Sequence, residues 1–198
     1  MIVMDIESSG LDSGRCGIWQ IGAVELENPN NTFIQEARID DKDEVTQEAL
    51  IITEKTEQEL RDKNKQSQKQ LIENFLNWCK KCRERIIAGQ NVGWDISFIQ
   101  NKCIRYGIHD KFHDLLGVRI IDLHTIANLK YKEKNGVFRL KDEKTGKSDM
   151  SLPNVMKFCG LKDNRRVVEN GKLIKEGEAH NALTDAKLTA ECLRRLLK

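Results

Sequence analysis

Two carboxylates stand two residues apart near the start of the chain, Asp5 and Glu7 in the apolar sequence IVMDIES. On a β-strand such side chains leave the same face, while the flanking Met4 and Ile6 point the other way, into a core. Neighbouring carboxylates repel each other and resist burial unless a positive charge lies between them. A divalent cation bound by oxygen atoms would supply that charge. The pair therefore indicates either a metal site or a strand end that faces water.

Two further acidic residues and one histidine stand near predicted helix starts. Asp95, in the sequence NVGWD, either complements the helix dipole or is a ligand. His180 and Asp185 lie five residues apart in HNALTD, where Asp185 half faces the core and needs a partner. The small residues Ala182 and Ala186 would let this helix approach a sheet closely. His180 is either a loop histidine with no task or a group that exchanges protons near neutral pH.

The elements that must position these residues follow from the hydrophobic periodicity. Apolar runs predict strands near 2–6, 18–26, 32–39, 86–89 and 118–122. The first three form an antiparallel meander, with an Asn-Pro-Asn-Asn turn at 28–31. Helical spacing predicts a helical region from about 47, with a capping box at Thr56 and Glu59, and helices near 66–84, 94–106, 122–131, 151–159 and 181–197.

The two remaining stretches lack a clear apolar period. This pattern predicts an exposed loop over residues 132–149 and an irregular or hairpin segment over residues 162–178. Three early strands followed by alternating helices and strands indicate a mixed α/β sheet flanked by helices. We expect a single domain over residues 1–198.

The composition is typical of an ordinary globular domain. The chain has 198 residues, of which 39% are hydrophobic and 32% are charged. No run reaches the roughly 18 apolar residues of a membrane span, and the N-terminus lacks the pattern of a signal peptide. The six cysteines therefore predict reduced thiols in a cytoplasmic protein with no membrane partner. The sequence CKKC at Cys79 and Cys82 lacks the second pair of ligands that a structural zinc site needs.

Charge is distributed unevenly along the chain. The net charge is +2, but residues 1–60 carry 14 acidic and 4 basic side chains. The basic excess is concentrated in 130–147, with 7 basic and 3 acidic residues, and in 162–175, with 5 basic and 2 acidic residues. Such segments indicate either a polyanionic partner such as a nucleic acid or an ordinary solvated surface.

Taken in order, the motifs DIESSGL, NVGWD and HNALTD resemble those of the DEDDh (DnaQ-like) family of 3′→5′ exonucleases, which includes the proofreading subunit of bacterial DNA polymerase III. The sequences WQIGAV, VRIIDL and SLP are similar to further segments of that family, so the resemblance covers nearly the whole chain. It implies a ribonuclease-H-like fold. Because the sequence ends directly after the last predicted helix, we expect no attached polymerase or helicase domain.

The resemblance implies a role for each matching acidic residue and for the histidine. Asp5, Glu7, Asp95 and Asp185 would be catalytic carboxylates that bind two Mg²⁺ ions, for which Mn²⁺ could substitute. His180 would be the general base. Two such ions would clamp the scissile phosphate, activate a water molecule and stabilise the leaving oxygen.

A second set of residues would bind the substrate in this resemblance. The backbone of the loop 8–11 would hold the terminal nucleotide, and its last residue would wedge against the terminal bases. These implied contacts come from Ser8, Ser9, Gly10 and Leu11. Asn91 matches the asparagine of the second motif.

The implied function is hydrolysis of phosphodiester bonds at single-stranded 3′ ends, with release of nucleoside 5′-monophosphates. DNA is the favoured substrate, and roles in DNA replication and repair, with a DNA polymerase as a partner, would follow. The alternatives are an RNA-trimming exoribonuclease of the same family and a catalytically silent nucleic-acid-binding module. All five catalytic positions are filled, which argues against the silent module.

Overall fold

A mixed five-stranded sheet forms the centre of the fold. The computed structural model describes residues 1–117, 119–169 and 171–198, and the strands lie in the order β3-β2-β1-β4-β5. Strands β1, β2 and β3 form an antiparallel meander, whereas β4 and β5 run parallel to β1. Their bounds are Ile2–Ser8, Ile18–Glu25, Asn28–Glu36, Ile87–Gly89 and Ile120–Asp122. The predicted mixed α/β sheet is confirmed.

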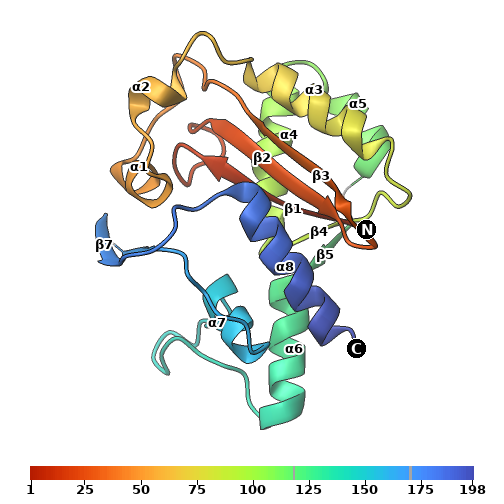
Figure 1. The fold of residues 1–198 in the computed structure, drawn as a ribbon, viewed down its shortest axis with the longest axis vertical. Coiled ribbons are helices and arrows are strands. Elements are labelled where there is room, and N and C mark those ends of the chain that lie inside the picture. The colour runs from red at the N-terminus through yellow and green to blue at the C-terminus, as the bar shows by residue number, and fades with distance from the viewer. Residues whose placement is uncertain (118, 170) are drawn as a thin grey trace.

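Helices cover both faces of this sheet (Figure 1). On one face lie α3 (Gln68–Cys79), α4 (Gly93–Arg105) and α5 (His109–Leu116). The other face is covered by α8 (Ala182–Leu196), with α6 and α7 packed against it. The bounds of these last two helices are Leu123–Asn135 and Leu152–Phe158.

Two short helices and a small hairpin lie near the end of β1 (Figure 1). The helices are α1 (Gln47–Thr53) and α2 (Glu57–Leu60), and α2 begins with the predicted capping box. The strands β6 (Val167–Glu169) and β7 (Lys172–Lys175) pair as an antiparallel hairpin that packs against α1.

Strand β1 separates two apolar cores by alternation of its side chains. Ile2, Met4 and Ile6 pack with α3, α4 and α5, whereas Val3 packs with the core beneath α6, α7 and α8. Because side chains on a strand alternate between faces, Asp5 leaves the sheet on the same side as Val3. The predicted orientation of this strand is confirmed.

Helix α8 approaches β2 closely because Gly22 has no side chain. A Cβ atom at Gly22 would lie 2.1 Å from the backbone nitrogen of Leu183 and 2.2 Å from the carbonyl carbon of Ala182. Gly22 pairs with Asp5 in the β1–β2 ladder, so the same contact brings the first turn of α8 beside Asp5. Ala182 and Ala186 are fully buried in this contact, as their small size predicted.

One local prediction is corrected by the structure, and one helix was missed. The predicted turn at 28–31 is wrong, because the turn comes earlier, at 26–27, and Asn28 begins β3. Pro29 is tolerated there because β3 is an edge strand, where a missing N–H need not break the sheet. Helix α5 was not predicted. Of the strand predicted at 118–122, residues 120–122 are confirmed, and Val118 lies outside the described residues.

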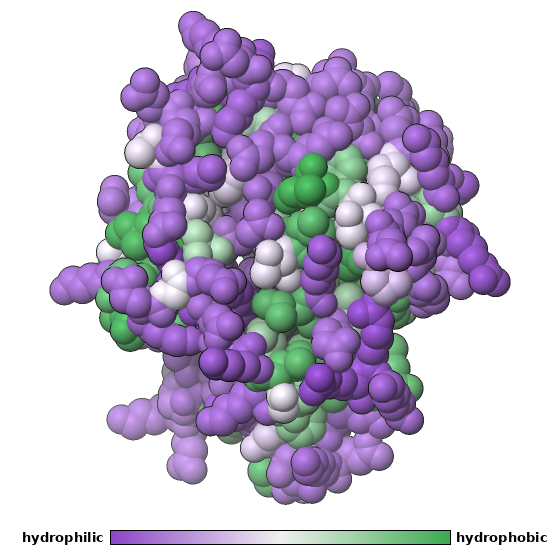
Figure 2. All heavy atoms as spheres, in the orientation of Figure 1, coloured by the Kyte–Doolittle hydropathy of each residue, from purple (hydrophilic) through white to green (hydrophobic). Residues whose placement is uncertain are grey.

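Figure 2 shows one face on which hydrophilic residues predominate and hydrophobic ones gather mainly near the centre. Among the described residues, no helix is long and apolar enough to cross a membrane.

Candidate active site

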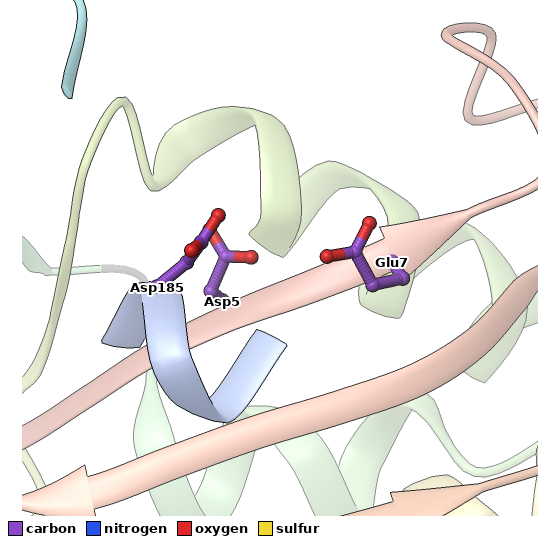
Figure 3. A group of neighbouring side chains, drawn as sticks. All are labelled: Asp5, Glu7 and Asp185. Atoms are coloured by element: carbon purple, nitrogen blue, oxygen red, sulfur yellow. The ribbon is translucent and has the colours of Figure 1, made fainter. Parts of the chain in front are cut away.

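Three carboxylates meet on the face of the sheet that α8 covers, and Figure 3 shows their side chains turned toward one another. Asp5 and Glu7 come from β1, and Asp185 comes from the first turn of α8. One oxygen atom of each lies within 4.8 Å of the others. Asn181 fixes the start of α8 by accepting hydrogen bonds from two backbone N–H groups of that turn. The structure thus brings three of the four predicted metal ligands together.

Burial makes this cluster electrostatically unfavourable without a cation. Glu7 is 8% exposed and Asp185 is 5% exposed. Burial raises the pKa of Asp5 well above its ordinary value, and the charges of Asp95, Asp185 and Glu7 raise it further. The pKa of Glu7 is raised in the same way, first by burial and then by Asp185 and Asp95. The guanidinium of Arg165 opposes both of these increases.

Asp95 lies beside the three carboxylates rather than among them. It stands in the first turn of α4 and is 3% exposed, and its Oδ1 accepts a hydrogen bond from the backbone N–H of Ile6 at 3.1 Å. This bond ties the start of α4 to β1 between the two carboxylates of that strand. Burial raises the pKa of Asp95 to about 8. Its role as a metal ligand stays a prediction.

His180 contacts the edge of the carboxylate cluster. Its Nδ1 lies 3.3 Å from Oδ2 of Asp185, and its Nε2 lies 3.1 Å from the carbonyl oxygen of Arg166. Because a carbonyl oxygen only accepts hydrogen bonds, we assign the hydrogen to Nε2, and Nδ1 is then the nitrogen that can take up a proton. The backbone N–H of His180 donates to the carbonyl of Ile52 at 3.1 Å, which ties the histidine to α1.

A buried arginine that the sequence analysis did not single out joins the cluster. Arg165 is 4% exposed, and its Nη1 donates to Oδ2 of Asp185 at 2.8 Å. Its Nε and Nη2 donate to the two carboxylate oxygens of Asp163, at 3.0 and 2.9 Å. Arg166 is also buried and pairs with Glu54. These two basic residues of the segment 162–175 are therefore engaged within the protein and not displayed to a polyanion.

The donor set fits a divalent metal ion. Oδ1 of Asp185 is buried and has no hydrogen-bond partner among the residues that the structure describes. A buried polar atom without a partner is rare, because its desolvation is not repaid by a bond. Carboxylate oxygens are the ligands that Mg²⁺ and Mn²⁺ prefer. Asp5, Glu7 and Asp185 could therefore hold such an ion, with the free Oδ1 as one ligand atom.

A cavity of about 450 Å³ opens beside the carboxylates and includes all three in its lining. Apolar side chains of Leu11, Trp94 and Ile52 line it, and Arg15 and Glu48 add charged groups. Leu11 is 76% exposed although it is a large apolar residue. A cavity of this size, with apolar walls and a few charged groups, is suited to a small organic ligand.

The loop 8–11 lies against this cavity. Ser8, Gly10 and Leu11 contribute to its lining, whereas Ser9 is fully buried. The hydroxyl of Ser9 donates to the carbonyl of Glu44 at 2.6 Å and accepts from the N–H of Gly17 at 2.8 Å. The side chain of Ser9 therefore holds the loop in place and is not available to a ligand. A substrate contact from its backbone stays a prediction.

Asn91 lies apart from this cavity. It is exposed, has a positive φ of 55°, and its backbone N–H donates to Oδ1 of Asp122 at 2.9 Å. It lines a different pocket with residues that include His124 and Ser148. The structure does not bring Asn91 together with the loop 8–11, and its predicted substrate contact stays a prediction.

A second buried charge cluster is centred on Asp43, next to Glu44, whose carbonyl accepts the hydrogen bond from Ser9. Asp43 accepts from the fully buried Lys102 at 2.7 Å, from Arg105 at 2.7 Å and from Gln68 at 2.7 Å. Lys102 and Arg105 belong to α4, and Arg105 also donates to the carbonyl of Gly14 at 3.1 Å. The same helix therefore carries Asp95 and anchors the segments that border the cavity. Sequence periodicity offered no signal for this cluster.

Comparisons with known proteins agree with this geometry. The model of the RNase_T family, described as exonuclease, matches residues 2–193. The PolC-type DNA polymerase III of Pediococcus pentosaceus is 26% identical over 135 residues, which are 68% of this chain and 9% of that protein. The structure of E. coli exonuclease I in complex with a dT13 oligonucleotide has a TM-score of 0.72 at 18% identity, covering 100% of this chain and 40% of that one. Exonuclease I from Methylocaldum szegediense has a TM-score of 0.69 at 18% identity, covering 99% and 39%.

The chain belongs to this exonuclease family, a class of enzymes that hydrolyse phosphodiester bonds. The resemblance to the DnaQ-like 3′→5′ exonucleases is thereby confirmed, and the structural similarity confirms the ribonuclease-H-like fold. The chain spans less than half of the exonuclease I chains and 9% of the PolC-type polymerase. Substrates and partners of those longer proteins do not transfer to it directly.

Proposed function

We propose that residues 1–198 form one exonuclease domain that uses divalent metal ions to remove nucleotides from single-stranded 3′ ends and to release nucleoside 5′-monophosphates. The observation that carries this proposal is the convergence of Asp5, Glu7 and Asp185 at a cavity of about 450 Å³. Buried carboxylates and a cavity of this size suit a metal site next to one terminal nucleotide.

DNA is the proposed substrate, and a DNA polymerase is the proposed partner. The similar fold of an exonuclease I that was crystallised with a dT13 oligonucleotide supports the substrate. The match to a PolC-type DNA polymerase III supports a polymerase context, in replication or repair. All six cysteines are free, which supports a reducing compartment such as the cytoplasm.

The metal ligands would be Asp5, Glu7 and Asp185, with Asp95 beside them, and the ions would be two Mg²⁺ or Mn²⁺. When bound, such ions polarise the phosphate and lower the pKa of a bound water molecule. The chain contributes carboxylates that are in place before the substrate arrives, since β1 and α8 fix their positions. This preorganisation avoids the cost of assembling like charges at the moment of reaction.

His180 would act as the general base through Nδ1. This nitrogen lies 3.3 Å from Oδ2 of Asp185, beside the carboxylate cluster. The hydrogen bond from Nε2 to the carbonyl of Arg166 fixes the orientation of the ring. Removal of such a base typically lowers a rate by roughly 10²–10⁴-fold.

The loop 8–11 would hold the terminal nucleotide in the cavity. The exposed Leu11 and the ring of Trp94 supply apolar surface against which a base could pack, and Nε1 of Trp94 donates to the carbonyl of Leu11 at 3.3 Å. A loop that grips an end favours attack at a terminus over attack within a chain.

The proposal is tested by the release of mononucleotides from a single-stranded DNA oligomer. Protein stripped of metal with a chelator should release none, and added Mg²⁺ or Mn²⁺ should restore the release. Asp185→Asn should remove the activity, and Asp114→Asn, an exposed residue on α5, is the matched control. An RNA oligomer of the same sequence measures the alternative substrate. Binding of the oligomer without release of any mononucleotide would contradict the proposal and indicate a catalytically silent nucleic-acid-binding module.

A further inference from the structure

We infer that Arg165 is a positioning residue for metal binding, which holds one oxygen of Asp185 and leaves the other oxygen free to bind a metal ion. This inference rests on the proposed function, because it assigns a task to a residue outside the ligand set. The observation behind it is a buried guanidinium bonded to one side of a carboxylate whose other side has no partner.

The two oxygens of Asp185 have different surroundings. Oδ2 accepts from Nη1 of Arg165 at 2.8 Å and lies 3.3 Å from Nδ1 of His180. Oδ1 is buried and lacks a hydrogen-bond partner among the described residues. Rotation of an aspartate carboxylate about its last bond is broad and roughly two-fold, so the bonds to Oδ2 fix the orientation of the carboxylate and leave Oδ1 free to bind a metal ion.

The arginine is itself fixed. Its side chain is 5% exposed, and the two carboxylate oxygens of Asp163 accept hydrogen bonds from its Nε and Nη2. Planar, two-point contacts of this kind are specific to arginine, because lysine offers a single charged nitrogen. Met156 lies against the same guanidinium, with its sulfur 3.8 Å from Nη2.

The neighbouring backbone holds Arg165 relative to the rest of the site. Arg166 donates from Nη1 to the carbonyl of Ile51 at 3.0 Å, and its own carbonyl faces Nε2 of His180. The backbone N–H of Arg166 donates to the backbone carbonyl of Glu178 at 2.9 Å. The segment that carries Arg165 is thereby tied to α1 and to the start of α8, the two helices that flank the carboxylates.

Charge alone does not explain this arrangement. A positive group beside a metal site repels the metal, and Asp163 offsets that charge by pairing with the same guanidinium. The pair of Asp163 and Arg165 carries no net charge, so it adds little net repulsion toward a metal ion, while the bond from Nη1 fixes the orientation of the Asp185 carboxylate. Hydrogen-bond partners of metal ligands contribute roughly 10–100-fold to metal affinity in other sites, and we expect a loss in that range when the geometry is removed.

The test measures Mn²⁺ affinity of the metal-free full chain by titration, with electron paramagnetic resonance of free Mn²⁺ as the readout. Arg165→Lys keeps the charge but loses the two-point contact, and it should bind Mn²⁺ roughly 10–100-fold more weakly than the wild type. Arg139→Lys is the matched control, because Arg139 pairs with Asp149 at 2.9 Å outside the site, and its affinity should be unchanged.

A second variant guards against misfolding. Asp163→Asn combined with Arg165→Met removes both members of the ion pair, so that the carboxylate of Asp163 is not left without its partner. The double variant should show the same loss of Mn²⁺ affinity. Wild-type affinity in Arg165→Lys, with or without a loss in the double variant, would overturn the geometric role. A wild-type protein that binds no Mn²⁺ would overturn the proposed metal site and this inference with it.

Discussion

Replacing Asp5 by asparagine should stabilise the metal-free protein at about pH 8 and remove most of its response to Mg²⁺. The substitution takes one charge from the cluster at nearly constant shape. One oxygen of each carboxylate lies within 4.8 Å of the others, and like charges at that distance repel by about 1 kcal/mol in bulk water and about 3.5 kcal/mol at an effective dielectric of 20. For a protein of this size, each 1 kcal/mol moves the melting temperature by roughly 2–4 °C, so the apo variant should melt up to several degrees higher.

The pH dependence of this effect has a defined sign. The pKa values of Asp5, Glu7 and Asp95 are raised in the folded protein, that of Asp95 to about 8. Above about pH 4 the unfolded chain releases protons that the folded protein keeps, so the free energy of unfolding falls by about 1.4 kcal/mol per pH unit for each kept proton. The stability is fully present below the unfolded pKa and is lost as the pH rises toward about 8. The advantage of Asp5→Asn should therefore grow as the pH rises above about 5.

The assay is a thermal melt of both proteins after chelation, with and without Mg²⁺, across this pH range. Mg²⁺ should raise the melting temperature of the wild type through linkage, and that of the variant much less. Asp114→Asn, which is exposed, should behave as the wild type. Two results together would refute this reasoning and show that the cluster is structural. The Asp5→Asn variant would be less stable than the wild type without metal, and Mg²⁺ would shift the melting temperature of neither protein.

Three further substitutions test other parts of the site. His180→Ala should keep Mn²⁺ and oligomer binding but lower the single-turnover rate by roughly 10²–10⁴-fold, and an unchanged rate would exclude it as the base. Replacing the exposed Lys141, Lys144 and Lys147 by glutamine should weaken single-strand binding for every sequence and flatten its salt dependence in anisotropy titrations. A wild-type salt slope would leave that loop without a binding role. Gly22→Ala should lower the melting temperature and the Mg²⁺ response, because its Cβ would lie 2.1 Å from the α8 backbone; wild-type values of both would contradict the docking argument.

The sequence predicted those parts of the fold that local patterns determine. The alternation around Asp5 and Glu7 placed both carboxylates on one face, and the alanines after His180 predicted a helix close to the sheet. Both features depend on spacing within a single element. The three motifs then predicted a site that joins β1 to α8, and the structure brings Asp5, Glu7 and Asp185 together as expected.

Other features depend on contacts between distant segments and have no local signal. Arg165 lies in a basic stretch, and charge pattern alone predicts that such a stretch faces solvent or binds a polyanion. Its burial against Asp185, 20 residues away, becomes visible only in the folded chain. In the sequence, Lys102 looks like an ordinary polar residue of a helix. Its partner in the interior, Asp43, is 59 positions away, so no local pattern indicates the pair. The turn before β3 was misplaced because Asn-Pro-Asn-Asn has turn chemistry, although an edge strand accommodates it.

The measurement that tests the central claim most directly is the digestion of single-stranded DNA labelled at its 5′ end, with Mg²⁺ present. We predict a ladder of labelled products that shorten stepwise from the 3′ end, strong inhibition by a 3′-phosphate, and no digestion of a circular strand of the same sequence. Digestion of the circle at a comparable rate, or immediate release of the labelled 5′ nucleotide, would contradict a 3′→5′ exonuclease.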